Sequence, residues 1–180
     1  MAWSGKVKSW IAPFFMAEVN GNVVKRSNAL LGYSSSGKIL TYSEAQVFPD
    51  VFAAFNASVG LVLGLLVLAF YPLRFLLIHS NLLPAPGCGP DLKQLQRGFL
   101  RITSVGRGGN GSQKSSELFF PNDAGYIDTA RMLVESGLSV VAKSSSSTPL
   151  AGGFYTPAAA MGDDVLDRLI AGGCVFVEHE

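Results

Sequence analysis

The stretch GYSSSGK, at residues 32–38, has the glycine and lysine spacing of a phosphate-binding P-loop. In a P-loop, backbone N–H groups and the lysine bind nucleotide phosphates, and a Ser or Thr directly after the lysine binds magnesium. Ile39 occupies that last position here, and a helical pattern rather than a buried strand precedes the stretch. We therefore interpret residues 32–38 as a loop and not as a nucleotide site.

A second glycine pattern, G-x-G-x-x-G, is formed by Gly106, Gly108 and Gly111. In a dinucleotide-binding fold a helix follows this pattern at once, so that its N-terminus meets the pyrophosphate. The segment that follows here, SQKSSELFF, is rich in serine and then strand-like. The pattern favours a hairpin loop between two strands, and the sequence predicts no tight binding of NADP or ATP.

His79 and His179 are the only two histidines of the chain, and their isolation supports no Ser-His-Asp arrangement. We predict no catalytic residue. His79 lies just past a long apolar run, where it could be an axial ligand to a tetrapyrrole such as a porphyrin or chlorophyll. An interfacial polar anchor is the favoured interpretation of His79. Bound lipid or pigment is the only cofactor that the sequence leaves open.

A metal site is not predicted either. Cys88 and Cys174 are far apart and form no CxxC pair, and Cys174 lies in the apolar run CVFV, which is typical of a buried thiol. Three acidic residues occur in the first turns of a predicted helix, where the positive end of the helix dipole favours carboxylates without a metal. They are Asp163, Asp164 and Asp167.

One apolar run dominates the elements around these residues. No charged side chain occurs from residue 51 to residue 73, and sixteen of the twenty residues from 51 to 70 are apolar. A helix of that length is about 30 Å long, which matches the hydrocarbon core of a bilayer. We predict a helix that contacts lipid or a neighbouring transmembrane helix. Spanning is favoured, with a surface-lying helix and a buried core helix as alternatives.

Gly60 and Gly64 form a GxxxG step inside this run. That spacing lets a second helix approach closely in lipid, so we predict a helix-packing site at these two glycines. Lys38 before the run and Arg74 and Lys93 after it are too few to orient it in a membrane. The predicted partners are the lipid bilayer and other membrane proteins.

The segments on either side of the run predict helices and strands. The start, MAWSGKVKSWIAPFF, is somewhat like a signal peptide, but the start of an amphipathic helix is favoured. Residues 12–31 have apolar positions at helical spacing, with Phe15, Val19, Val23 and Leu30 near one face. ILTYSEAQVF is either a short strand or the entry of a helix. LLPAPGCGPD, with three prolines and two glycines, predicts a linker.

The C-terminal half combines both periodicities. GFLRITSVG and ELFF predict a hairpin, a helix is expected at about 125–142, another opens at Pro157 and runs to Gly172, and CVFVE predicts a terminal strand. The predicted fold class is α+β, a small mixed sheet with flanking helices plus one hydrophobic, transmembrane helix. The predicted domains are an N-terminal helix and loop segment at 1–50, the membrane helix at 51–79, a linker at 80–97 and an α+β domain at 98–180.

Composition limits the class of protein. Of the 180 residues, 48% are hydrophobic and only 15% are charged, well below the usual quarter or so of a soluble domain. This deficit indicates a large buried interface or contact with lipid. The net charge of +1 gives no electrostatic footprint for nucleic acid, which is therefore not expected as a partner.

Several segments resemble saccharopine dehydrogenase-like oxidoreductases. The N-terminal PFFMAEVNGNVVKRSNALLGY and the linker LLPAPGCGPD are similar to segments of that family. The C-terminal resemblance rests on Gly125, Thr129, Ala130, Met132, Glu135, Gly152, Gly153, Thr156, Pro157, Ala158, Ala159, Gly162, Leu166 and Leu169. The resemblance implies the second, α+β domain of such an enzyme. The family's Rossmann domain, with GxGxxG after its first strand, would precede Trp3, so its nicotinamide-binding residues have no counterpart to carry over.

Two functions compete on this basis. The favoured one is a non-catalytic, membrane-embedded accessory subunit of a respiratory or photosynthetic complex, a pseudoenzyme located in the thylakoid or inner mitochondrial membrane. The alternative is the C-terminal domain of an NAD(P)-dependent oxidoreductase whose Rossmann domain lies elsewhere. A lipid-surface-associated protein is the third expectation.

Overall fold

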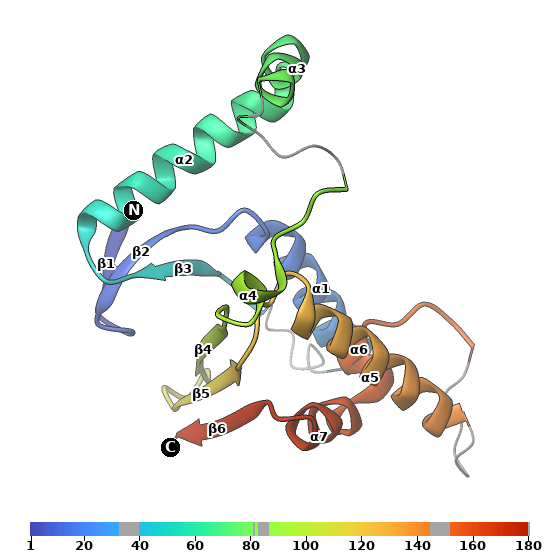
Figure 1. The fold of residues 1–180 in the computed structure, drawn as a ribbon. Coiled ribbons are helices and arrows are strands. Elements are labelled where there is room, and N and C mark those ends of the chain that lie inside the picture. Colours follow the sequence, from blue (N-terminus) through green and yellow to red (C-terminus); the bar gives the residue numbers. More distant parts are fainter. Residues whose placement is uncertain (33–39, 81, 83–86, 145–151, 180) are drawn as a thin grey trace. The chain divides into compact units, whose positions relative to one another are not determined.

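The computed structural model describes residues 1–32, 40–80, 82, 87–144 and 152–179, and of the predicted loop at 32–38 only its first residue lies within them. The chain folds as two compact units (Figure 1). Unit 1 consists of Met1–Asn22 and Thr41–Pro90, and unit 2 consists of Val23–Leu40 and Asp91–Glu180. Each unit is therefore built from two stretches of sequence.

Unit 1 contains a three-stranded antiparallel sheet of β1 (Ala2–Ser4), β2 (Ser9–Pro13) and β3 (Ala45–Phe48), in that spatial order. The prediction of a helix at the N-terminus is wrong, because residues 2–13 form a hairpin. Trp3 and Trp10 lie directly opposite each other, with ring centroids 5.8 Å apart in an edge-to-face arrangement that stabilises such a pair. The segment ILTYSEAQVF resolves as a strand, β3, and not as a helix entry.

Helix α1 (Ala17–Leu30) begins later than the predicted helix over 12–31, since β2 takes the first residues. The apolar face expected along it is largely exposed, at Phe15, Val19 and Val23. The buried position is Gly21, whose backbone lies against the ring of Tyr42. A Cβ built there would be 3.4 Å from the Tyr42 ring.

The apolar run forms α2 (Val51–Ala69), which confirms the prediction of a helix. Asp50 caps its start, because the Asp50 carboxylate accepts the Ala53 N–H at 2.8 Å. The helix stops at Phe70, which has an extended backbone, and α3 (Tyr71–His79) begins directly after it with Pro72 in its first turn. Proline cannot continue a helix from the preceding turn without a clash, which explains the break.

Unit 2 is a three-stranded antiparallel sheet with helices. Strands β4 (Leu100–Arg107) and β5 (Gln113–Phe120) form the predicted hairpin, and β6 (Val175–His179) pairs with β5, so the predicted terminal strand is confirmed. The helices are α4 (Leu92–Leu95), α5 (Ile127–Ser144), α6 (Pro157–Met161) and α7 (Asp163–Ala171). The single helix predicted from residue 157 is wrong, because Gly162, with φ of 58°, divides it into α6 and α7.

The core of unit 2 lies between one face of its sheet and two helices. Phe120, Leu169 and Cys174 are buried there, and four partly buried apolar side chains pack against them: Leu100, Leu118, Met132 and Val165. Because side chains alternate along a strand, Leu100, Leu118 and Phe120 share this face, and the opposite face presents Arg101, Phe119 and Val175. The sheet thus has one face packed on helices.

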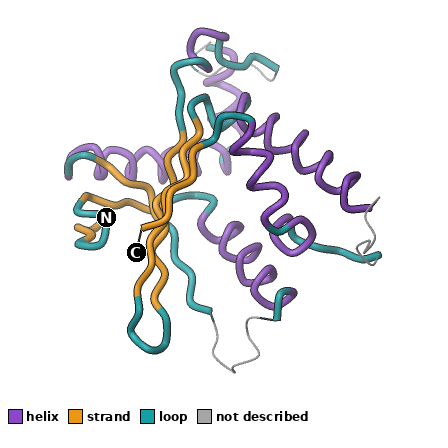
Figure 2. The backbone as a smooth tube through the Cα atoms, turned by 90° about the horizontal axis from the view of Figure 1, so that it is seen from below, coloured by secondary structure: helices purple, strands orange, loops and turns teal. Residues whose placement is uncertain are grey.

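The fold mixes helices and strands as predicted, with both kinds of element along the tube in Figure 2. The described residues form seven helices and two three-stranded sheets. The expectation of one small mixed sheet is wrong, since there are two sheets and each is antiparallel throughout. Within the described residues, α2 is the one helix long and apolar enough to cross a membrane.

Candidate functional site

A buried carboxylate, Asp128, is the most enclosed charged group of the described residues. It has no exposed surface and lies in the first turn of α5. Its two oxygens accept the backbone N–H of Asn122 at 3.0 Å and the Asn122 side-chain amide at 3.5 Å. Its own N–H donates to the Asp123 carbonyl at 2.9 Å. The carboxylate therefore fixes the turn between β5 and α5.

Arg131 extends this cluster to the turn after α7. Its guanidinium lies 3.5 Å from the Asp128 carboxylate and donates to the Gly172 carbonyl at 2.6 Å. Gly172 follows α7, so one guanidinium joins the start of α5 to the turn that leads into β6. A buried charge needs a partner and hydrogen bonds, and this arrangement supplies both.

Cys174 lies beside this cluster at the entry of β6 and is buried. Burial is the main cause that raises the pKa of the Cys174 thiol, and the nearby Asp128 carboxylate raises it further against the opposing effect of Arg131. A raised pKa keeps the thiol protonated at neutral pH. The expectation of a buried thiol is confirmed, and Cys174 is suited to packing and not to nucleophilic attack.

A polar depression of about 350 Å³ lies at the hairpin end of the unit 2 sheet. It is lined by Ser104, Gly106, Lys114, Ser115, Ser116, Glu178 and His179. Ser104, Ser116 and Lys114 continue the sheet face that carries the core, at the end nearest the hairpin loop. The serine hydroxyls and the Lys114 ammonium are hydrogen-bond donors that can hold a carbonyl oxygen, and the Glu178 carboxylate of the same lining is an acceptor.

The glycine pattern at 106–111 closes the β4–β5 hairpin, as predicted. The N–H of Gly108 donates to the Ser112 carbonyl at 2.8 Å, and Gly111 has φ of 84°, a backbone conformation that favours glycine. A strand and not a helix follows the loop. The local geometry therefore lacks the helix N-terminus that a pyrophosphate would need.

The three aspartates lie in α7 as expected, and one has an ionic partner. Asp163 and Asp164 are in its first turn, and the Asp164 carboxylate is 3.3 Å from the ammonium of Lys143. Among the described residues, no group of three or more Cys, His, Asp or Glu side chains is placed to hold a metal ion. Arg168 pairs with Glu135 at 3.6 Å, which ties α7 to α5.

His79 and the two helix glycines lie in unit 1. His79 is the last residue of α3, and its ring centroid is 4.3 Å from that of Phe75. A Cβ built at Gly60 or Gly64 would meet no described atom within 4 Å. Both glycines thus lie on an open helix surface, and packing of a second helix against them stays a prediction.

Sequence reasoning missed Asp128 and Arg131 as a pair. Their spacing of three residues on one helix was the available signal, since residues i and i+3 face each other. The spacing could not show that Asn122 hydrogen-bonds to Asp128 and that the Gly172 carbonyl hydrogen-bonds to Arg131. Just before α5, the Asp123 carboxylate accepts the Tyr126 N–H at 2.8 Å.

Comparison with known proteins relates the chain to a set of mycobacterial enzymes. A trans-acting enoyl reductase of Mycobacterium ulcerans is 34% identical over 174 residues, which cover 92% of this chain and 40% of the relative. Trans-acting enoyl reductases of Mycobacterium bovis and Mycobacterium tuberculosis are each 33% identical over 173 residues, covering 93% of this chain and 40% of the relative. The chain thus spans about 40% of the length of the curated relatives it matches. No family model and no solved structure matches it.

These relatives correct several expectations from the sequence. The resemblance to saccharopine dehydrogenase-like oxidoreductases is wrong as an identification, because the matching proteins are named enoyl reductases. The expectation of a non-catalytic accessory subunit, a pseudoenzyme of a photosynthetic or respiratory complex, is wrong for the same reason, since the relatives are named as enzymes. Identity of about a third over more than nine-tenths of the chain relates it to proteins named trans-acting enoyl reductases.

Proposed function

We propose that this chain is a region of an enoyl reductase, an enzyme that saturates the carbon–carbon double bond of an α,β-unsaturated acyl group. The observation that carries the proposal is the match of 92–93% of the chain to proteins with that name. Saturation adds a hydride to the β-carbon and a proton to the α-carbon. The hydride donor is a reduced nicotinamide or flavin. We assign its binding site to a part of the whole enzyme outside the hairpin loop at 106–111.

Within that enzyme, we assign the polar depression of unit 2 to the carbonyl oxygen of the acyl substrate. Hydride addition to the β-carbon pushes negative charge onto this oxygen, so donors aimed at it favour the reaction. Lys114 supplies a positive charge there, and Ser104 and Ser116 supply hydroxyl groups. The ion pair of buried Asp128 with partly exposed Arg131 is a positioning device that holds β6, and thereby Glu178 and His179, in place.

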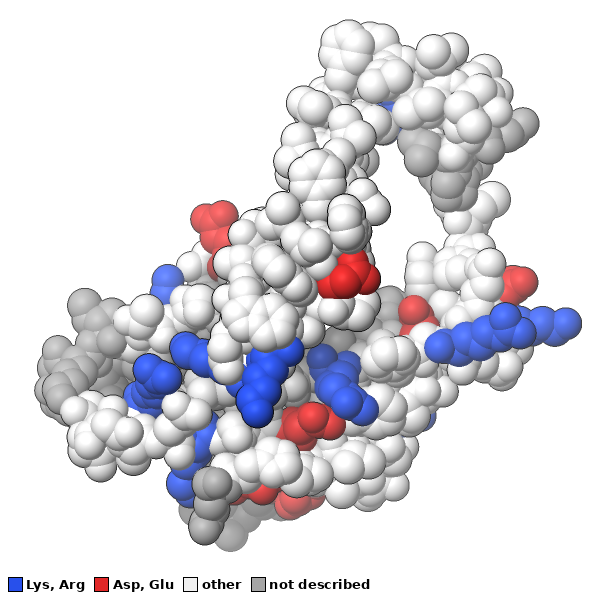
Figure 3. Space-filling view, turned by 90° about the vertical axis from the view of Figure 1, so that its left-hand side faces the viewer, with Lys and Arg blue, Asp and Glu red and all other residues white. Residues whose placement is uncertain are grey.

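Unit 1 adds contact with a membrane to this proposal. Only Ala54 of α2 is buried, and large apolar side chains project from it at exposures from 40% to 76%. Figure 3 shows the segment formed by α2 and α3 with almost no charged side chain on the visible face. A helix that is apolar on every side is stable in lipid or in the core of a large protein. We propose that α2 contacts lipid. The apolar partners of this enzyme are then the acyl substrate and the bilayer.

The activity is tested by exchanging the matched region of a relative. The 174 matched residues of the Mycobacterium ulcerans enoyl reductase are replaced with this chain, and the chimera is incubated with a short trans-2-enoyl thioester and reduced nicotinamide. Mass spectrometry of the acyl product reports the gain of two hydrogens. We expect the chimera to reduce the thioester, and a version in which the same region is deleted to be inactive.

Two controls make the result decisive. Circular dichroism shows whether the chimera is folded, and Lys114→Met in the chimera tests the assigned oxygen site with a side chain of similar length. We expect that variant to reduce kcat by about tenfold to a hundredfold, since it removes a donor that acts on developing charge. A folded chimera that leaves the thioester unsaturated would show that this chain does not belong to an enoyl reductase.

A further inference from the structure

We propose that α2 and α3 insert into one leaflet from one side of the membrane, so that α2 does not cross the bilayer. The inference rests on the lipid contact proposed above and not on the reductase activity. It states how α2 binds the membrane, and it differs from the sequence prediction, which favours a helix that spans the bilayer.

The connectivity of unit 2 carries the first step. Unit 2 is assembled from residues before α2, Val23–Leu40, and residues after it, Asp91–Glu180. The Ser27 and Thr156 hydroxyls are 2.7 Å apart and joined by a hydrogen bond, although one residue precedes α2 and the other follows it. If α2 crossed the bilayer once, these two residues would lie on opposite sides. The second helix, α3, has nine residues and a length of about 13 Å, too short to cross back.

The packing of α2 within unit 1 carries the second step. Its N-terminal part lies on β2 and β3, with Ala54 buried and Ala57, Ser58 and Leu61 half-buried along the same side. Among the described residues no further strand pairs with β1 or β3, the two edges of the unit 1 sheet, and unpaired N–H and C=O groups cannot lie in hydrocarbon. The part of α2 that covers this sheet must therefore stay outside the hydrocarbon core.

Only the second part of α2 is then free to enter lipid. From residue 62 to residue 70 every residue except Val67 is exposed. The eight helical residues from 62 to 69 extend about 12 Å, which does not exceed the depth of one leaflet, roughly half of the hydrocarbon core. The apolar run is long enough to cross a whole bilayer, but contact with the sheet leaves only about half of α2 free to enter lipid.

Helix α3 has the residues of a membrane interface. The Arg74 guanidinium lies 5.3 Å from the centre of the Tyr71 ring, and His79 ends the helix against Phe75. Aromatic rings paired with polar groups settle at the level of the lipid headgroups, and a cation in the bilayer centre is costly. In Figure 1 α3 is seen nearly end-on while α2 runs across the view, so the chain turns sharply between them. With α3 at the level of the headgroups, the free part of α2 lies obliquely in the leaflet and not upright.

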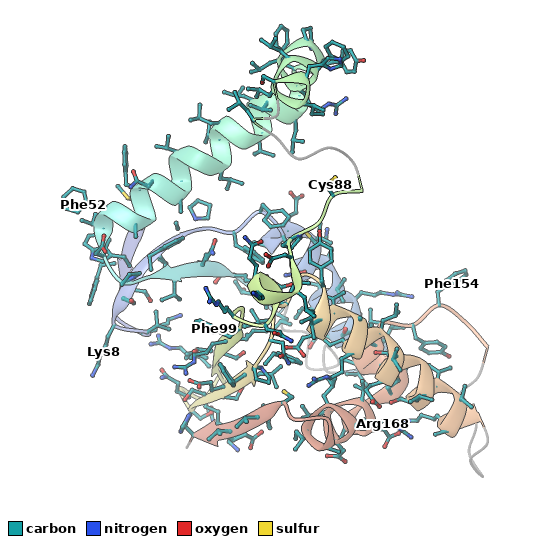
Figure 4. The ribbon with its side chains drawn as sticks, viewed as in Figure 1. Lys8, Phe52, Cys88, Phe99, Phe154 and Arg168 are labelled. Carbon is teal, nitrogen blue, oxygen red and sulfur yellow. The ribbon has the colours of Figure 1, made fainter. Side chains whose placement is uncertain are left out.

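Two cysteines report the sides of the membrane. Cys88 follows α3 and is exposed (Figure 4), and Val47→Cys places a second thiol before α2, at a side chain that is 53% exposed. The protein is reconstituted into sealed phosphatidylcholine vesicles and treated with a membrane-impermeant maleimide, and the mass of each intact chain gives its number of labels. One-sided insertion predicts chains with two labels or none. Chains that carry one label each, with the second added only after detergent, would overturn the inference.

Lipid as the occupant is tested separately by flotation with the same vesicles. We expect the full chain to float with the vesicles, and Leu66→Asp to weaken its partition by about a hundredfold, the effect of a carboxylate at the centre of an inserted helix. The matched control is Leu133→Asp, on α5 in unit 2, which changes another exposed leucine and is expected to leave flotation unchanged. A folded chain that does not float would show that α2 does not enter lipid, and then the membrane proposal itself fails.

Discussion

Replacement of Asp128 is expected to destabilise the protein more than any other single carboxylate change in unit 2. Asp128→Ala removes the acceptor of the partly buried Asn122 N–H and the ionic partner of Arg131. A buried donor left without an acceptor costs about 1–3 kcal/mol, and a broken buried ion pair costs about 3–5 kcal/mol. Arg131 remains about a quarter exposed and keeps the Gly172 carbonyl, which places the expected loss at the low end, about 3 kcal/mol.

The expected loss is measured by urea unfolding followed with far-ultraviolet circular dichroism. With a urea dependence of about 2 kcal/mol per molar, 3 kcal/mol lowers the midpoint by roughly 1.5 M. Asp128→Asn keeps an oxygen that can accept the Asn122 N–H, so it should lose less, about 1–2 kcal/mol. Glu117→Gln is the matched control, because its pair with Arg101 is largely exposed and should contribute under about 1 kcal/mol. If Asp128→Ala loses no more than Glu117→Gln, the carboxylate does not hold the unit together.

Three further outcomes follow from local geometry. Gly162→Ala should destabilise the protein by about 1–3 kcal/mol, because its φ of 58° with ψ of −133° is strained for alanine. Gly137→Ala, inside α5 with open space around it, should stabilise the protein by about 1 kcal/mol. Thermal unfolding midpoints that shift in the same direction for both variants would contradict this. A thiol reagent should modify Cys88 at once and Cys174 only after unfolding, and rapid modification of both in the native protein would show that Cys174 is not buried. Because the pKa of Cys174 is raised in the folded state, the contribution of the protonated thiol to stability is complete at neutral pH and should decline as pH rises above about 8.5. The loss of stability in alkali should therefore be smaller in Cys174→Ala. Parallel plots of unfolding free energy against pH for the variant and the unchanged protein would refute that assignment.

Strong local patterns allowed much of unit 2 to be predicted. The alternating apolar residues of GFLRITSVG, the glycine loop and CVFVE identified all three of its strands, because alternation and turn chemistry act over a few neighbouring residues. The division at Gly162 was missed since glycine is also tolerated inside helices, and only the backbone angle shows that the chain turns there. The N-terminal hairpin was missed because two lysines before an apolar run also suit a helix start.

The candidate site was less accessible to prediction. Lys114, Ser116 and Glu178 lie on two strands that pair only after about sixty residues of intervening chain have folded, and no spacing in the sequence encodes that pairing. The apolar run was identified as helical correctly, yet its length alone could not show that β2 and β3 cover half of it. The predicted class of protein was wrong, because the resemblance pointed to saccharopine dehydrogenase-like oxidoreductases and the matching relatives are named enoyl reductases.

The discontinuous build of unit 2 has a consequence for the order of folding during synthesis. Ser27 leaves the ribosome long before Thr156, which is 129 residues further along, so the contact between them cannot form until most of the chain has been made. During that interval α2 is complete and exposed. Unit 2 is still incomplete, because its two segments precede and follow α2 in the sequence. At about 5–20 residues per second the delay lasts on the order of ten seconds. Over that period a nascent chain with an uncovered apolar helix is prone to aggregation, which makes early capture by a membrane or a chaperone an expected step in its biogenesis.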